Sequence, residues 1–359
     1  VRLRSKQVGS LERSITDSLP NTNNKDCDMT TPSRLSLLGA GALALGLCTP
    51  LLAQAEDLRF GGNFTDDHSS SRAMARFAET LAEQSDGDLT AQLFPNMQLG
   101  GAGENLDQVS SGAIMGSWIG ISYLSRTVPE LEALSLPFAF DSREDAFALI
   151  DGEVGELLDE KLAEAGFVAL GYMELGFRHV TNAERPLESI EDFQDLKIRL
   201  QPNQTHLDTF RAIGANPVSM DIKEVYGALQ QGVLDGQENP YSIIETKRLD
   251  EVQPYLSDTG HFYDYIVVVA NRDKFEDLSD DQRATLMAAM DEAVAWQRET
   301  AAAEDTQARD TLIERGMQFT PISDETRAAL REASQSVVDD LREKLGAELV
   351  DKVLEELGA

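Results

Sequence analysis

Two arginines and an asparagine between residues 176 and 240 are the side chains of this sequence best suited to bind an anion. Arg199 lies in the run Leu196-Lys-Ile-Arg-Leu, whose alternation predicts a β-strand with the guanidinium on its polar face. Arg178 lies on the preceding strand-like stretch, and Asn239 in a turn-rich one. Such an arginine can donate two parallel N–H···O bonds to a carboxylate, worth about 1.5–3 kcal/mol for charge-assisted bonding. The segment predicts a site for a small carboxylate, with a surface ion pair as the alternative for Arg199 and a backbone cap for Asn239.

The remaining sequence lacks the motifs of the common catalytic classes. None of its four histidines belongs to an HExxH motif or lies beside a carboxylate cluster of the metal-binding type, which argues against zinc. The run Gly116–Gly120 has its serine one position too early for a nucleophile elbow, and no phosphate-binding GxxxxGK(S/T) motif occurs. We therefore expect no metal, no cofactor and no enzyme activity.

Short β-like runs alternate with amphipathic segments, a pattern typical of an open α/β layer. Residues 58–62 form the first expected strand, and residues 70–85 a helix with Met74, Phe77 and Leu81 on one face. Further strands are expected at residues 89–94, 113–118, 167–173, 179–181, 197–200, 265–270 and 317–320, and helices at 143–149, 153–165, 204–213, 223–231 and 324–357.

A much longer helical pattern runs from Ser279 to Glu314. A helix of about 36 residues spans about 54 Å, which is more than the width of a small domain. The pattern therefore predicts a helix that crosses two lobes. The alternative is a pair of helices with a break near residues 301–305.

The first 55 residues have the composition of an export signal preceded by extra sequence. Met29 to Arg34 form a short positive region, Leu35 to Leu52 an apolar one, and Ala53-Gln-Ala a cleavage site. We interpret residues 29–55 as a secretory signal peptide and residues 1–28 as an upstream start artefact. The mature protein is then periplasmic and does not span a membrane.

Removal of that segment would leave a strongly acidic protein without cysteine. Both cysteines, Cys27 and Cys48, lie within it, which excludes disulfides and thiol chemistry from the mature chain. The full sequence carries a net charge of −32, and residues 56–359 carry about −34. Such a surface repels nucleic acid, so we expect no nucleic-acid partner.

Seven runs of the sequence occur in the same order in one known family. They are Phe94-Pro-Asn-Met-Gln-Leu-Gly100, Leu136-Pro-Phe138, Gly176-Phe-Arg178, Asp195-Leu-Lys-Ile-Arg199, Gly214-Ala-Asn-Pro217, Glu224-Val-Tyr226 and Gly232-Val-Leu-Asp-Gly-Gln-Glu-Asn239-Pro240. The sequence thus resembles the solute receptors of tripartite ATP-independent periplasmic (TRAP) transporters, of the dicarboxylate-receptor type. The resemblance implies an α/β fold of the two-domain periplasmic-binding-protein type (type II-like), in which a long helix spans both domains and the domains close over a cleft.

The resemblance also implies which residues bind the ligand. The chief carboxylate-binding arginine of the family corresponds to Arg199, a second anion contact to Arg178 and the pocket amide to Asn239. Two departures from the family pattern are Asp195, where glycine is usual, and Ile222, where an aromatic residue commonly stacks on the ligand. The further cleft residues that we expect are Asn63, His68, Trp118 and Glu174.

We expect domain I to comprise residues 56–175 and 265–304, and domain II residues 176–264 and 305–359. The expected function is capture of a sugar acid such as a hexuronate, or of a C4-dicarboxylate, for uptake through integral membrane TRAP subunits. Hydroxyl binding by Glu174, His68 and Asn239 favours the sugar acid. The alternatives are a receptor for an ATP-driven importer and a periplasmic enzyme that acts on an organic acid.

Overall fold

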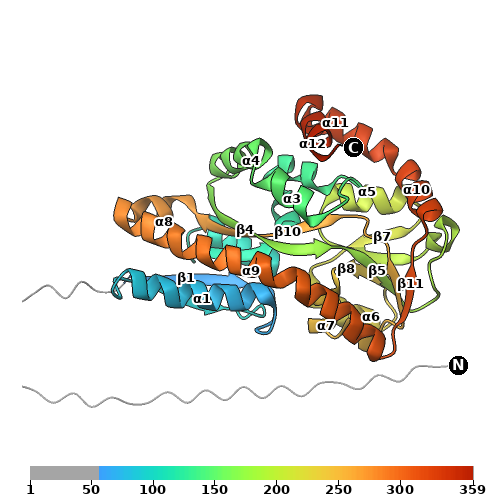
Figure 1. Ribbon diagram of the computed structural model, residues 1–359, viewed down its shortest axis with the longest axis horizontal. Helices are drawn as coiled ribbons and strands as arrows, with labels where there is room; N and C mark the ends of the chain where they lie inside the picture. The colour runs from blue at the N-terminus through green and yellow to red at the C-terminus, as the bar shows by residue number, and fades with distance from the viewer. Residues whose placement is uncertain (1–55, 359) are drawn as a thin grey trace, which may run out of the picture. The chain divides into compact units, whose positions relative to one another are not determined.

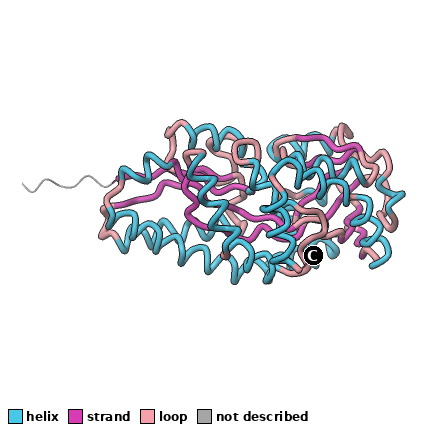
Figure 2. Tube along the Cα trace, turned by 90° about the horizontal axis from the view of Figure 1, so that it is seen from above, coloured by secondary structure: helices cyan, strands magenta, loops and turns pink. Residues whose placement is uncertain are grey.

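Two β-sheets organise the computed structural model, which describes residues 56–358. The expected signal peptide and the residues before it lie outside this range. Figure 2 shows the strands in two groups with helices around them. The strands are β1 (Glu56–Gly62), β2 (Leu89–Phe94), β3 (Gly116–Gly120), β4 (Phe167–Phe177), β5 (His179–Asn182), β6 (Lys197–Leu200), β7 (Asn216–Ser219), β8 (Gly236–Asn239), β9 (Tyr255–Asp258), β10 (Tyr263–Asn271) and β11 (Gln318–Pro321).

The helices flank these sheets. They are α1 (Ser69–Gln84), α2 (Ala102–Ser110), α3 (Arg143–Ile150), α4 (Glu153–Glu164), α5 (Gln204–Ala212), α6 (Ile222–Gln230), α7 (Tyr241–Thr246), α8 (Arg272–Asp277), α9 (Asp280–Glu314), α10 (Asp324–Ala333), α11 (Gln335–Leu345) and α12 (Ala347–Leu357), with short 3-10 turns that include η1 (Ile121–Leu124) and η2 (Pro129–Ser135).

The first sheet has the order β2-β1-β3-β10-β4, and we call it and its helices the first lobe. β10 is antiparallel to both of its neighbours and buried along its whole length. Val267 and Val269 face the apolar core that includes α3, α4 and α12, whereas Ile266 and Val268 face the core beneath α1 and α9. A strand covered on both faces is continuously apolar, which explains its sequence.

The second sheet has the order β11-β9-β5-β8-β6-β7, and it defines the second lobe. Ile198 and Leu200 on β6 pack in a core with α5 and α10. Leu256 on β9 packs in another core with α6, α7 and the last turns of α9. The alternation expected at residues 196–200 thus buries the apolar residues of β6 on one face and leaves Arg199 on the other.

The long helix α9 belongs to both lobes. Leu286 and Met290 lie in the first-lobe core, and Ala308 and Leu312 in a second-lobe core. Figure 1 shows α9 passing both sheets. The helix is continuous over 35 residues, so the prediction of a single spanning helix is confirmed and the break at residues 301–305 is absent.

The chain also crosses between the sheets at two adjacent segments. Arg178 joins β4 to β5, and residues 259–262 join β9 to β10. The N–H of Arg178 donates to the carbonyl of Phe262 at 2.9 Å, and its carbonyl accepts from the N–H of His261 at 3.3 Å. These two crossings and α9, together with a later return of the chain from α10 to α11, connect the two lobes, and such a junction allows lobes to hinge.

Three short strands of the second sheet were not predicted. β7, β8 and β9 each have four residues, and β8 has the polar sequence Gly-Gln-Glu-Asn although all four residues are buried. Asn239 therefore ends a strand rather than lying in a turn-rich segment. The local sequence lacked the signal because polar contacts, and not an apolar face, hold β8 in place.

The C-terminal helices α11 and α12 pack against the first lobe. The expected domain limits assigned everything after residue 304 to domain II, yet Leu341 of α11 and Val350 of α12 lie in a first-lobe core with residues of α3 and α4. The residue limits of the two domains stay a prediction.

The departure at Asp195 is explained by its backbone. Asp195 has a φ of 62°, in the left-handed region that glycine adopts most readily. Its side chain is exposed, whereas Arg199 is fully buried. The substitution therefore affects the turn before β6 and leaves the surroundings of Arg199 without an added carboxylate.

We predict that Gly62→Ala destabilises the first lobe by about 1–3 kcal/mol, the usual cost of overpacking a core. A Cβ at residue 62 would lie 2.1 Å from Cε2 of the fully buried Trp118. Urea unfolding monitored by tryptophan fluorescence measures the loss. Gly103→Ala on α2 is the control, because a Cβ there meets no atom within 4 Å. Equal unfolding midpoints for Gly62→Ala and wild type would contradict this packing.

Candidate anion-binding cleft

A small cavity lies between the two lobes. Its first-lobe wall includes Asn63, Tyr123 and Leu175, and Leu175 is the bulged residue at which the pairing of β4 with β10 shifts register. Its free volume of about 20 Å³ holds about one water molecule. The lobes must therefore separate to admit an organic ligand. The second-lobe wall comprises Arg199, Gln201, Ile222, Asn239, Ile243 and Lys247.

Arg199 is the buried cation of this cavity that lacks a counter-ion. Its side chain is fully buried on β6. Nε donates to the carbonyl of Met220 at 2.8 Å and Nη2 to the hydroxyl of Tyr123 at 3.2 Å, but Nη1 has no hydrogen-bond partner. Within residues 56–358, no carboxylate approaches the guanidinium within 4 Å. Because an unpaired buried charge is costly, this geometry favours an anionic ligand.

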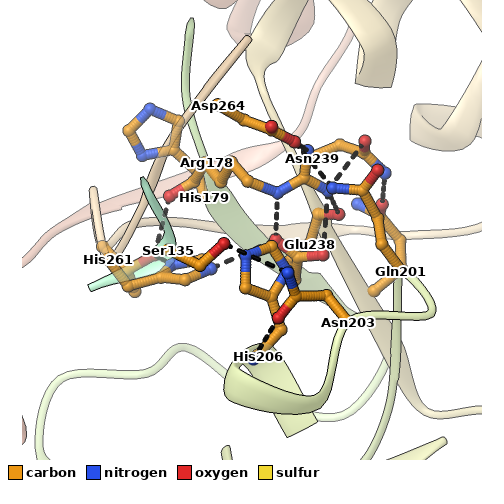
Figure 3. A network of polar contacts seen from close by, with 12 residues as sticks. Ser135, Arg178, His179, Gln201, Asn203, His206, Glu238, Asn239, His261 and Asp264 are labelled. Atoms are coloured by element: carbon orange, nitrogen blue, oxygen red, sulfur yellow. Dashed lines mark hydrogen bonds and ion pairs between the residues drawn. The ribbon is translucent and has the colours of Figure 1, made fainter. Parts of the chain in front are cut away.

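Arg178, by contrast, is neutralised by the protein itself. Its guanidinium forms buried ion pairs with Glu238, through both Nε and Nη2, and with Asp264, where Nη1 lies 3.0 Å from Oδ2. Nη2 also donates to Oδ1 of Asn239 at 3.1 Å. Figure 3 shows Arg178 among these partners. Arg178, expected as a second anion contact, does not line the cavity that contains Arg199.

The ion pairs of Arg178 reach the cavity through two amides. Asp264 accepts from Nε2 of Gln201 at 2.7 Å, and Asn239 is held by Arg178 and by the side chain of Gln237. Both Gln201 and Asn239 line the cavity next to Arg199. Arg178 therefore positions two of the amides that line the cavity.

Burial and charge set the pKa values in this network. Burial alone would raise the pKa of Glu238, but Arg178 and His261 hold it well below its ordinary value. Burial raises the pKa of Asp264, with Arg178 opposing the shift. Burial lowers the pKa of His261 to about 4, against the attraction of Glu238. Glu238 is thus the ionised partner of Arg178, and His261 is neutral at pH 7.

Lys247 is a second cation in the cavity, and the sequence did not predict it. It follows α7, and its Nζ donates to the carbonyl of Asn63 at 2.9 Å. Burial lowers its pKa from 10.5 to about 8, against the opposing influence of Asp221 and Asp67. The sequence signal that could have indicated Lys247 is its position eight residues after Asn239, because a short helix between them returns the chain to the cavity. Tyr123 and Gln201 were also missed, since neither lies in a recognisable motif.

The predicted residues thus fall into separate groups. Arg199, Asn239 and Asn63 lie together in the cavity, and Ile222 supplies an aliphatic wall. Trp118 instead packs in the first-lobe core and donates to the hydroxyl of Ser71 at 3.4 Å.

His68 and Glu174 line a different cavity beside α9, with a volume of about 330 Å³. His68 caps α1 through Nδ1, which accepts from the N–H of Ser70, and burial lowers its pKa to about 3. Glu174 is ion-paired with Arg143 at 2.7 Å. The structure therefore does not bring these two side chains to Arg199.

Two α/β lobes, a cavity at their hinge and a buried guanidinium without a counter-ion define a two-lobed binding protein. The family of bacterial extracellular solute-binding proteins, family 7 (DctP), matches residues 60–345, and this chain belongs to that family. The match confirms the resemblance to TRAP solute receptors of the dicarboxylate-receptor type, and with it the fold class. Among residues 56–358, no helix is long and apolar enough to cross a membrane, and no cluster of three or more His, Cys, Asp or Glu side chains is suited to a metal ion.

Individual relatives are similar along nearly their whole length. The 2,3-diketo-L-gulonate-binding periplasmic protein YiaO of Escherichia coli K12 is 33% identical over 83% of this chain and 92% of its own. The sugar acid binding protein DctPAm of Advenella mimigardefordensis, solved with galactonate, is 32% identical with a TM-score of 0.83, over 85% of this chain and 98% of its own. A TRAP periplasmic solute binding protein of Sulfurospirillum deleyianum, solved with succinate, is 30% identical with a TM-score of 0.80, over 84% and 99%.

We predict that Arg178→Met lowers the free energy of unfolding by about 3–5 kcal/mol, because it leaves Glu238 and Asp264 buried without their partner. Urea unfolding at pH 7 followed by circular dichroism measures the change. Arg309→Met serves as the control, since Arg309 pairs with the exposed Asp310 and such pairs contribute little. If both variants unfolded like the wild type, Arg178 would not hold the lobes as described.

Proposed function

We propose that this protein captures a small carboxylate in the periplasm and delivers it to the integral membrane subunits of a TRAP transporter. The observation that carries the proposal is Arg199, which is fully buried, lines the cavity and has an unpartnered Nη1. The relatives support it, because 2,3-diketo-L-gulonate, galactonate and succinate all contain a carboxylate. A sugar acid and a C4-dicarboxylate are therefore the two ligand classes to consider.

Arg199 binds the carboxylate, and neutral groups of the protein fix the orientation of the guanidinium. Nε of Arg199 donates to the carbonyl of Met220, and Nη2 donates to the hydroxyl of Tyr123. Nη1 has no partner in the protein and is therefore the guanidinium nitrogen left to donate to the ligand. Tyr123 belongs to η1 of the first lobe, while Arg199 belongs to the second. Closure of the lobes thus brings a first-lobe hydroxyl to the guanidinium, and a ligand that contacts both favours the closed state.

The protein binds its ligand without converting it. Two histidines beside the Arg178 network are poor proton carriers, because burial lowers the pKa of His206 to about 3 and that of His261 to about 4. Proton NMR of galactonate and of succinate, each incubated with an equimolar amount of protein, should contain no product signal. Accumulation of a product would instead identify an enzyme.

We predict that Arg199→Met weakens the binding of the preferred acid by about 2–5 kcal/mol, or roughly 30- to several-thousand-fold. Isothermal titration calorimetry with galactonate and with succinate measures the loss. The variant should fold, because methionine removes a buried charge that has no protein counter-ion.

Arg211→Met is the matched control, since Arg211 lies on α5 and pairs with the partly exposed Asp208. It should bind like the wild type. A folded Arg199→Met protein with wild-type affinity for both acids would remove Arg199 as the anchor.

A further inference from the structure

The charged side chains that line the cavity are all of one sign. Arg199 and Lys247 are the cationic side chains that line it, and none of its lining residues is Asp or Glu. The polar groups beside them are neutral, namely the amides of Asn63, Gln201 and Asn239 and the hydroxyl of Tyr123. Such a wall offers two positive charges to a ligand, whereas one carboxylate balances only one of them.

Lys247 has unused hydrogen-bonding capacity. An ammonium group carries three donors, and the hydrogen bond found for Nζ is the one to the carbonyl of Asn63. Within the described part of the chain, no carboxylate lies within 4 Å of it, in contrast to the lysines at residues 161, 223, 344 and 352. Asp67 and Asp221 act on it only from a distance.

The charge of Lys247 disfavours folding. Burial lowers the pKa of Lys247 to about 8, which means that the protein destabilises the protonated form relative to water. A partly buried cation without a counter-ion adds no stability, so its place in a ligand cavity points to binding. Lys247 also donates across the cleft, from the end of α7 in the second lobe to the loop after β1 in the first.

We propose that Lys247 is the second anion contact of the cleft, so that the protein selects ligands with two negative groups over ligands of the same shape with one. This inference rests on the proposed function, because it takes Arg199 as the first contact. It assigns to Lys247 the role that the sequence had suggested for Arg178, whose guanidinium is already balanced by Glu238 and Asp264. Glu174, an acceptor that a polyhydroxy acid would use, is ion-paired with Arg143 outside this cavity.

The test compares ligands that differ by one charge. The probes are malonate, succinate, glutarate and adipate, the monoamide of each, and galactonate. We expect the wild type to bind one of the diacids at least tenfold more tightly than its monoamide and than galactonate. Lys247→Met should lose about 10- to 100-fold in affinity for that diacid, the range for one charge-assisted hydrogen bond, and little for its monoamide.

Two further variants make the result specific. Lys247→Arg keeps the charge and should keep the preference for the diacid. Lys247→Met should unfold at a higher temperature than the wild type at pH 7, since it removes a charge that burial disfavours, so weak binding cannot be attributed to misfolding. Lys274→Met is the matched control, because Lys274 lies on α8, outside the cavity.

The pH dependence supplies an independent readout. Lys247 in the free protein loses its proton near pH 8, and a bound dianion favours the protonated form, so affinity should fall as the pH rises past about 8. The other charged or titratable groups around Lys247 are Asp67 and His68 before α1, Tyr123 in η1, Asp221 before α6, and Arg199 on β6. Burial lowers the pKa of His68 to about 3 and raises that of Tyr123 above its ordinary value, so neither titrates between pH 7 and 9.5. In Lys247→Arg the affinity should stay constant over this range.

The outcomes separate the two proposals. Two outcomes would contradict Lys247 as the contact for a second negative group. One is a wild type that binds galactonate or a monoamide as tightly as every diacid. The other is an equal loss of affinity for diacid and monoamide in Lys247→Met. If Arg199→Met left the binding of all acids unchanged, the proposed function of the cleft would fail as well.

Discussion

A buried positive charge without a negative partner is the constraint on which this cleft depends. Arg199 and Arg178 are both fully buried, yet only Arg178 is surrounded by carboxylates. Taking a guanidinium out of water is tolerable when ionised groups of the protein accept its hydrogen bonds, and unfavourable when they do not. The protein uses one arginine to fasten its lobes and leaves the other electrostatically unsatisfied. In the proposed function, a carboxylate supplies the missing partner of Arg199, and the free energy recovered is then available to hold the lobes together.

The fold makes that coupling between charge and closure possible. The apolar cores of the two lobes are largely separate, and the chain links them through Arg178, residues 259–262, α9 and the passage from α10 to α11. At the middle of α9, the side chain of Gln297 accepts from the N–H of Glu174 at 2.8 Å and donates to its carbonyl at 2.8 Å. This pair of bonds fastens β4 to the helix one residue before the bulge at Leu175, which lines the cavity. Movement about the junction therefore changes the cavity while both cores stay intact.

The sequence predicted the parts of this arrangement that have a local pattern. The alternation at residues 196–200 placed Arg199 on the polar face of a strand, and the long periodic run predicted α9. The different roles of the two arginines had no such pattern, because the partners of Arg178 are 60 and 86 residues away in the sequence. β8 was missed since its residues are polar, and Lys247 because only tertiary structure brings the end of α7 against Asn63. The sequence does not show which side chains become neighbours in the folded protein. Those neighbours decide whether a buried charge has a counter-ion.

The position of β10 has a consequence for how the chain reaches its native state. β10 separates β3 from β4 in the first sheet, although it follows β3 by more than 140 residues and comes after nearly all of the second sheet. A nascent chain that ends before residue 263 contains β3 and β4 but lacks β10, the strand that lies between them and pairs with both. Such long-range pairings close late and slowly, because the entropy of the intervening loop must be lost first. The first lobe to be synthesised is thus the lobe that cannot finish folding until the other has been made.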